Sequence, residues 1–176
     1  STTATDINGN TATDTATATD STPPAVELNV VINADGSATL SGTTEPGTSV
    51  IVQGPDGAAV PVNVAPDGSI SGSIAAPALA GSYSTTATDI NGNTATDTAT
   101  ASDSTPPAVE LNVVINTDGS ATLSGTTEPG ASVTVRGPDG AAVPVTVTPD
   151  GSISGSIAAP ALAGNYTATA TDINGN

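Results

Sequence analysis

A repeat of 83 residues is the sequence feature that most constrains the fold of this chain. Residues 21–50 recur almost unchanged at 104–133, and the turn Asp-Ile-Asn-Gly-Asn occurs three times, starting at residues 6, 89 and 172. Self-similarity at a fixed period is typical of units arranged one after another. We therefore expect similar bodies in tandem. The expected division is 1–20 as the C-terminal strand of a preceding repeat, 21–103 as a complete repeat, and 104–176 as a repeat that lacks its last strand.

A proline-rich junction stands at the start of each repeat. The sequence Asp-Ser-Thr-Pro-Pro occupies residues 20–24 and again residues 103–107. Proline fixes φ and has no amide donor, and it pushes the residue before it toward extended geometry. The two stretches are therefore predicted to be short, semi-rigid junctions between neighbouring bodies.

Between the junctions, short runs of alternating apolar residues are separated by clusters of Gly, Pro, Asn and Asp. This pattern is typical of a sandwich of antiparallel strands. In the first complete repeat it predicts seven strands, at about residues 26–32, 38–42, 50–53, 60–64, 70–74, 83–88 and 94–101. Because Pro61 cannot donate to a ladder, the strand over 60–64 is placed at a sheet edge. The predicted fold class is all-β, with tandem seven-stranded immunoglobulin-like β-sandwiches arranged end to end.

The charge of the chain is strongly one-sided, with 17 acidic residues, a single basic one (Arg136) and a net charge of −16. Like charges repel one another and destabilise a compact body. Two interpretations are open: a soluble, acid-rich surface, or a surface that a divalent cation neutralises in part. Such a surface suits neither nucleic acid nor anionic lipid. No apolar run of membrane length occurs, so membrane insertion is not expected.

An enzyme is the function class that the composition supports least. The chain has no Cys and no His, and its one basic residue is an arginine. Disulfides and thiolate metal sites are thereby excluded, and so is the commonest general base. The carboxylates fall in turns, where strong tuning of a pKa is not expected, and short turns on a narrow sandwich leave little room for a cleft.

The directions of the predicted strands decide which acidic residues meet at a junction. The first junction gathers Asp20, Glu45, Asp67, Asp89 and Asn91, and the second gathers Asp103, Glu128, Asp150, Asp172 and Asn174. The far end of the first repeat adds Asp35 and Asp56 to the second junction. Calcium prefers six to eight oxygen ligands from carboxylates, amides and carbonyls. The sequence therefore predicts a calcium ion at each junction.

The first ligands expected for this calcium are the linker Asp, the Glu before Pro-Gly and the Asp of the turn. These are Asp20, Glu45, Asp89, Asp103, Glu128 and Asp172. The alternative is that Asp and Asn in turns only bond their own backbone, as they commonly do. Asp97, inside the last predicted strand, is left open between an edge charge and a ligand.

Several motifs in a fixed order resemble a known family. They are Ser-Gly-Thr-Thr-Glu-Pro-Gly at 41–47, Pro-Asp-Gly at 66–68, Gly-x-Tyr at 81–83, Ala-Thr-Asp-x-x-Gly-Asn at 87–93 and Asp-Ser-Thr-Pro-Pro at 103–107. Together they resemble the bacterial immunoglobulin-like tandem repeats of large, type I-secreted, biofilm-associated surface adhesins, over essentially the whole chain. The resemblance implies an extracellular, non-enzymatic stalk, stiffened by calcium between domains, whose partners are neighbouring repeats of the same chain.

Two other functions remain open from the sequence. An orphan last strand in residues 1–20 and a repeat without its last strand in 104–176 would allow a self-assembling filament, completed by strand addition between identical chains. Thr at every second position of 11–19 and 94–100 places a row of hydroxyls on one strand face, and such rows can bind ice or carbohydrate. Thr also simply favours strands, and one strand per repeat does not supply the flat array that such binding needs.

Overall fold

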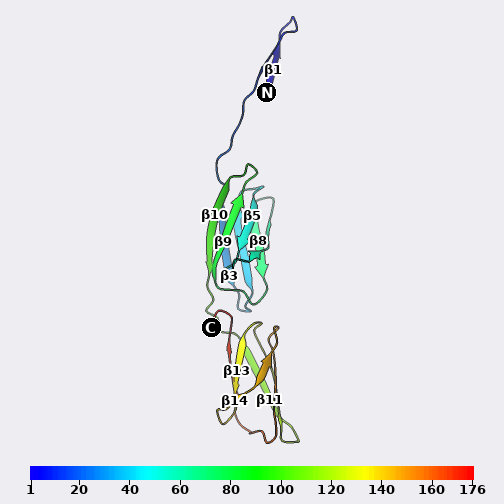
Figure 1. Ribbon diagram of the computed structural model, residues 1–176, viewed down its shortest axis with the longest axis vertical. Helices are drawn as coiled ribbons and strands as arrows, with labels where there is room; N and C mark the ends of the chain where they lie inside the picture. Colours follow the sequence, from blue (N-terminus) through cyan, green and yellow to red (C-terminus); the bar gives the residue numbers. More distant parts are fainter.

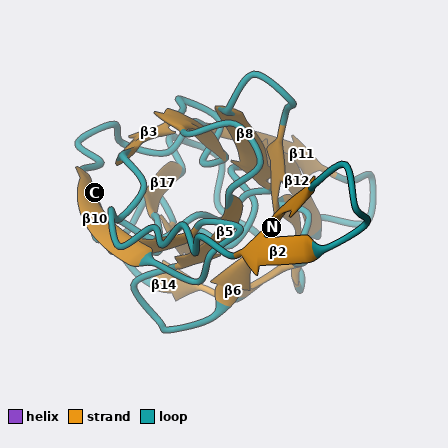
Figure 2. Ribbon diagram, turned by 90° about the horizontal axis from the view of Figure 1, so that it is seen from above, coloured by secondary structure: helices purple, strands orange, loops and turns teal.

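A computed structural model describes all 176 residues, which form strands and turns only. Two β-sandwiches lie end to end along the long axis, and a small hairpin extends from the N-terminal end (Figure 1). Seen along that axis, the strands of the second sandwich lie behind those of the first (Figure 2). The chain has no helix that is long and apolar enough to cross a membrane. The predicted all-β, immunoglobulin-like architecture is confirmed.

Repeat 1, residues 21–103, holds the complete sandwich. Its strands are β3 (Val26–Ile32), β4 (Ala38–Thr44), β5 (Ser49–Gln53), β6 (Ala59–Val60), β7 (Val62–Val64), β8 (Ser69–Ile74), β9 (Gly81–Thr88) and β10 (Thr94–Ala101). One sheet has the order β3-β4-β8-β7 and the other β10-β9-β5-β6, with every pair antiparallel. Alternate residues of these strands face inward. Ten buried residues form the core cluster, among them Leu28, Leu40 and Val52.

The segment around Pro61 differs from the prediction. A single edge strand was expected over residues 60–64, but the structure divides it into β6, which pairs with β5, and β7, which pairs with β8. The chain thus passes from one sheet to the other at Pro61. The proline has no N–H to offer either ladder, so the crossing leaves no backbone donor unpaired. Both short strands lie at sheet edges, as the proline required.

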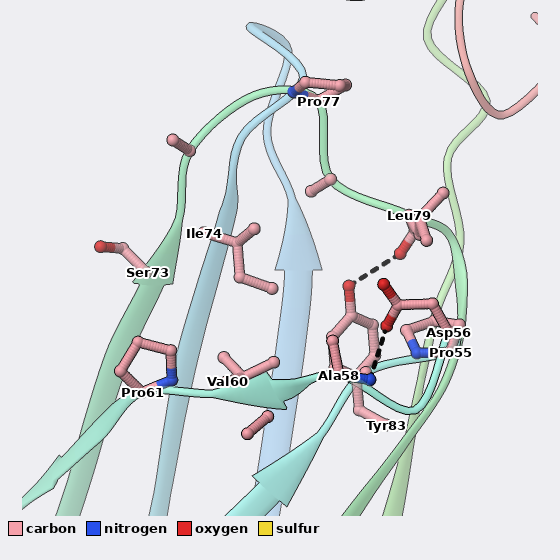
Figure 3. Close-up of a pocket in the computed structure, with 14 residues that line it drawn as sticks. Pro55, Asp56, Ala58, Val60, Pro61, Ser73, Ile74, Pro77, Leu79 and Tyr83 are labelled. Atoms are coloured by element: carbon pink, nitrogen blue, oxygen red, sulfur yellow. Dashed lines mark hydrogen bonds between the residues drawn. The ribbon is translucent and has the colours of Figure 1, made fainter.

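Tyr83 fixes the corner that leads into β9. Its side chain is fully buried, and its hydroxyl donates a 2.8 Å hydrogen bond to the carbonyl oxygen of Leu79. Tyr166 makes the same bond to Leu162 in the second repeat. A tyrosine that bonds the backbone a few residues upstream is a hallmark of immunoglobulin-like sandwiches. Figure 3 shows the bond within a pocket of about 340 Å³ lined partly by Pro61, Ile74 and Pro77.

Asp97, left open by the sequence, has a structural role. Its Oδ2 accepts a 2.8 Å hydrogen bond from the backbone N–H of Leu28. This bond ties β10, the edge of one sheet, to β3, the edge of the other. A hydrogen bond to a charged acceptor is stronger than a neutral one, so Asp97 closes the side of the sandwich.

Repeat 2, residues 104–176, repeats this architecture without a counterpart of β10. Its strands are β11 (Val109–Ile115), β12 (Ala121–Thr127), β13 (Ser132–Arg136), β14 (Ala142–Val143), β15 (Val145–Val147), β16 (Ser152–Ile157) and β17 (Thr167–Thr171). The sheets have the orders β11-β12-β16-β15 and β14-β13-β17, so β17 is an edge strand whereas β9 is flanked on both sides. Leu111 and Tyr166 are only half-buried, although their counterparts Leu28 and Tyr83 are buried. The last strand of the sandwich therefore covers one side of the core.

Residues 1–20 form a hairpin rather than the single strand expected. β1 (Thr2–Thr5) pairs antiparallel with β2 (Thr11–Asp14), and every residue of the segment is exposed. Residues 2–5 have the sequence of the end of β9, and residues 11–14 that of the start of β10. The hairpin therefore reproduces the pairing that the same sequences make in repeat 1.

Candidate functional site at the junction between repeats

The carboxylates of the Asp-Ile-Asn-Gly-Asn turns are occupied by their own turns. Asp89 accepts hydrogen bonds of 2.8 Å each from the backbone N–H groups of Asn91 and Asn93 and from the Asn93 side chain. Asp172 accepts the corresponding bonds from Asn174 and Asn176. These bonds lower the pKa of Asp89, and they outweigh the opposing effect of burial to lower that of Asp172. The turn role that was the alternative to calcium binding is thus present in both.

The linker carboxylates hold the same turns from the other side. Asp20 Oδ2 accepts a 2.8 Å bond from Asn91 Nδ2, and Asp103 Oδ2 accepts a 2.8 Å bond from Asn174 Nδ2. The other oxygen of each Asp accepts the backbone N–H two residues later. Each linker is therefore fastened to the turn of the repeat that follows it.

The two glutamates predicted as ligands have different surroundings. Glu45 is exposed, and its Oε1 accepts a 3.3 Å bond from the Ala25 N–H. Glu128 is half-buried, and its carboxylate lies against Gly36 in the first turn of repeat 1, where a β-carbon would overlap it. Burial raises the pKa of Glu128, and the negative charges of Asp172, Asp103 and Asp35 raise it further.

Repeat 1 and repeat 2 meet in a contact that we call the seam. On the side of repeat 1 it comprises the Gly36 turn, the segment 77–80 and the linker Asp103; on the side of repeat 2 it comprises Glu128, Gly130 and Asn174. A β-carbon on Gly130 would lie only 2.7 Å from Pro77 Cγ. The chain ends beside the seam (Figure 1). The two sandwiches thus touch directly and are not merely tethered.

Most of the acids predicted for the second junction do lie near the seam. Asp35 and Glu128 line a groove there of about 380 Å³, together with Glu110, which was not among the predicted acids. Asp56 does not join them, since it lies in the pocket of Figure 3 and accepts a hydrogen bond from the Ala58 N–H. Burial raises the pKa of Tyr83 in that pocket, and the negative charge of Asp56 raises it further. The segment 77–80 was not identified from the sequence, because Pro-Ala-Leu-Ala carries no charge and gives no signal of contact.

The arrangement of the acids bears on the predicted calcium. No group of three or more carboxylates in the chain is positioned so that it could hold a metal ion. The kinds of donor nevertheless suit calcium, since the seam offers carboxylates, an amide and carbonyl oxygens. The one basic side chain, Arg136, donates to the Gly140 carbonyl within its own turn. An ion at the seam would therefore require the side chains there to rearrange.

Residues 106–176 match the family model of the bacterial Ig domain. Repeat 2 is a bacterial Ig domain. Residues 21–50 recur at 104–133, and the two repeats share one strand order apart from β10. Repeat 1 is therefore a second copy of this Ig domain. No curated protein matches the chain.

Solved structures similar to this pair of Ig domains include part of a large adhesion protein and a domain of a biofilm-associated protein. The tetra-tandem repeat in the extending region of a large adhesion protein is 32% identical over 99% of this chain and 52% of that chain, with a TM-score of 0.48. The BSP domain of a biofilm-associated protein is 22% identical over 86% and 27%, with a TM-score of 0.35. The chain spans about half the length of the first of these.

We expect Glu128 to give the contact between the two Ig domains a pH dependence. A raised pKa means that the docked state binds the proton more tightly, so docking is favoured at low pH and weakens as pH rises through that pKa, above 4.5. The lowered pKa of Asp172 has the opposite effect on stability. Its contribution to the fold is present above pH 3.8 and is lost as the pH falls below that value. We expect docking in the absence of metal to be tightest between these values.

The variant Glu128→Gln should therefore dock at pH 7 as tightly as the parent does near pH 4. Its docking should no longer weaken as the pH rises above 4.5. The ¹⁵N shift of the Asn174 side-chain amide, followed in a pH titration with chelator, measures this. Glu45→Gln is the matched control, since it changes the same position of the first Ig domain, away from the seam. A parent and Glu128→Gln variant with the same titration curve would disprove the assignment.

Proposed function

We propose that this chain is a spacer of an extracellular bacterial adhesin, a stalk that holds an adhesive part away from the cell and supports cell adhesion and biofilm formation. The observation that carries the proposal is the seam: two Ig domains contact each other end to end through side chains and form one elongated body (Figure 1). The domains contribute length, and their acid-rich turns stand at the contacts rather than in a catalytic cleft.

We further propose that calcium stiffens the seam. The negative charges of Asp172, Asp103 and Asp35 are close enough to Glu128 to disfavour its ionised form. No basic side chain offsets these charges. A cation that binds only the docked form stabilises it by mass action. We assign two side chains to the ion, Glu128 and the linker Asp103. The carboxylate of Glu128 accepts no hydrogen bond from the protein.

Small-angle X-ray scattering with calcium and with chelator tests the calcium part. We expect the maximum dimension of the chain to be longest with calcium and to fall when the ion is removed, because the two domains then move over a wider range about the docked orientation. The double variant Glu128→Gln, Asp103→Asn should give the same curve in both conditions. A maximum dimension that calcium does not change would refute stiffening by the ion and leave the spacer function in place.

Strand exchange between identical chains is a second candidate, favoured by one observation. β17 has an open edge at the position that β10 fills in repeat 1, and residues 11–18 have the same sequence as β10, Thr94–Ala101. Residues 11–18 of one chain would complete repeat 2 of another, by strand addition. Sedimentation velocity of the 176-residue chain should then show concentration-dependent oligomers that disappear when residues 1–20 are deleted; a monomer throughout would exclude this role.

Direct binding of ice or carbohydrate stays a prediction. The exposed hydroxyls of β10 continue onto its neighbour, since Thr94 pairs with Thr88 and Thr96 with Thr86. The sequence indicated an array of hydroxyls one strand wide, whereas the structure shows two neighbouring strands. No charged side chain lies within these pairs.

A further inference from the structure

The side chain of Asn174 crosses the seam, and its amide uses three of its four hydrogen-bonding positions there. Oδ1 accepts a 2.7 Å bond from the Ala80 N–H, and Nδ2 donates to the Ala78 carbonyl at 3.1 Å. The second Nδ2 hydrogen goes to Asp103 Oδ2. A carbonyl and an N–H two residues apart are the groups that a neighbouring strand would bond in a parallel ladder. Asn174 thus binds repeat 1 as one residue of an added strand would.

The three copies of the turn show what this contact changes. Ile7, in the free hairpin, is 99% exposed, and Ile90, at the outer end of repeat 1, is 91% exposed. Ile173, next to Asn174 in the copy that lies at the seam, is 49% exposed. The sequence of the turn is identical in all three. The difference therefore comes from the repeat against which the third copy is docked.

Asn91 is the same residue without a docked neighbour. Its Nδ2 already donates to the linker Asp20, as Asn174 does to Asp103, so the linker bond forms whether or not a repeat is docked. The receiving sequence Pro-Ala-Leu-Ala of residues 77–80 also recurs, at 160–163. Each repeat thus carries the donor half of the contact at one end and the receiving half at the other, which is the requirement for head-to-tail stacking.

We propose that the Asn of the Asp-Ile-Asn-Gly-Asn turn is a latch that docks on the Pro-Ala-Leu-Ala segment of the preceding repeat and sets the orientation of the two repeats without a metal ion. This deepens the proposed spacer function and rests on it. It differs from calcium stiffening, since the latch selects the orientation and calcium narrows the motion around it. The partner of the free Asn91 end is accordingly the Pro-Ala-Leu-Ala end of another copy of this repeat.

The test measures the distance between the two repeats by pulsed electron spin resonance. The chain has no cysteine, so Ser71→Cys and Ser154→Cys, both at exposed strand positions, take two spin labels without interference. In this background we expect the distribution of distances between the two labels to have one maximum. It should lie at the same distance with calcium and with chelator, and it should be broader in chelator. Asn174→Ala should lose the single maximum in both conditions. Asn174→Asp, which keeps the shape and removes the donor, should lose it in chelator.

Asn91→Ala is the matched control, because it removes the same amide from the same turn but touches no neighbouring repeat. It should leave the distance distribution unchanged, and thermal melting should show that both alanine variants stay folded. A single maximum retained in Asn174→Ala, or an equal loss in Asn91→Ala, would overturn the latch and leave the spacer function standing. A parent chain with no single maximum even with calcium would overturn both.

Discussion

Replacing Leu40 with alanine should lower the free energy of unfolding of repeat 1 by about 2–5 kcal/mol. Leu40 is 1% exposed and lies on β4, in the middle of its sheet. The core of repeat 1 is a cluster of only ten buried residues, and Leu40 is one of its largest fully buried side chains. A small domain has a total stability of about 5–15 kcal/mol. The substitution therefore removes a large part of what holds this Ig domain together.

Urea denaturation followed by amide signals of repeat 1 in NMR spectra measures the loss separately from repeat 2. Val31→Ala is the control, since Val31 is 50% exposed on the neighbouring strand β3. Its effect should stay within about 0.5 kcal/mol. Equal midpoints for the two variants would show that the core is not where the structure places it.

Replacing Gly42 with alanine should destabilise repeat 1 by about 1–3 kcal/mol or more. Gly42 lies on β4 directly opposite Leu28 of β3, and a β-carbon there would overlap the backbone carbonyl of Glu27. Backbone atoms cannot rotate aside as a side chain can, so β3 and β4 would have to separate. Because β4 is also bonded to β8, the strain would spread through the sheet.

The same denaturation experiment tests this glycine. Gly125→Ala should cause the equivalent loss in repeat 2, where a β-carbon would overlap the Glu110 carbonyl. Ser41→Ala, one position away on the exposed face of β4, should change little. A Gly42→Ala variant as stable as Ser41→Ala would contradict the close approach of the two strands.

Much of the fold follows from the sequence because its causes are local. Alternating apolar residues locate the strands and the buried face, and Pro61 excludes the middle of a sheet. The same reasoning could not show that the chain changes sheets at Pro61. A missing N–H fits an edge strand and a crossing equally well, and only the pairing partners of Val60 and Val62 distinguish the two.

The junction was predictable in position but less so in detail. Strand directions alone brought Asp103, Glu128 and Asp172 to the same end of repeat 2. They could not show that the turn backbone already occupies Asp172, or that Asn174 reaches across to Ala78. The bonds to Asp172 are local to its turn and are the alternative to calcium binding that the sequence left open. The contact of Asn174 depends on side-chain directions at a surface that forms only when two folded repeats meet. Asp97 likewise needed the second sheet in place before its partner, the Leu28 N–H, was defined.

The central claim is that the two Ig domains form one elongated body with a fixed mutual orientation. Residual dipolar couplings of the ¹⁵N-labelled chain with calcium test it most directly, because each domain reports its own alignment. We predict that couplings from residues 26–101 and from residues 109–171 fit one alignment tensor, with one magnitude and one direction. Two tensors of clearly different magnitude would show that the domains move independently, and would contradict the account.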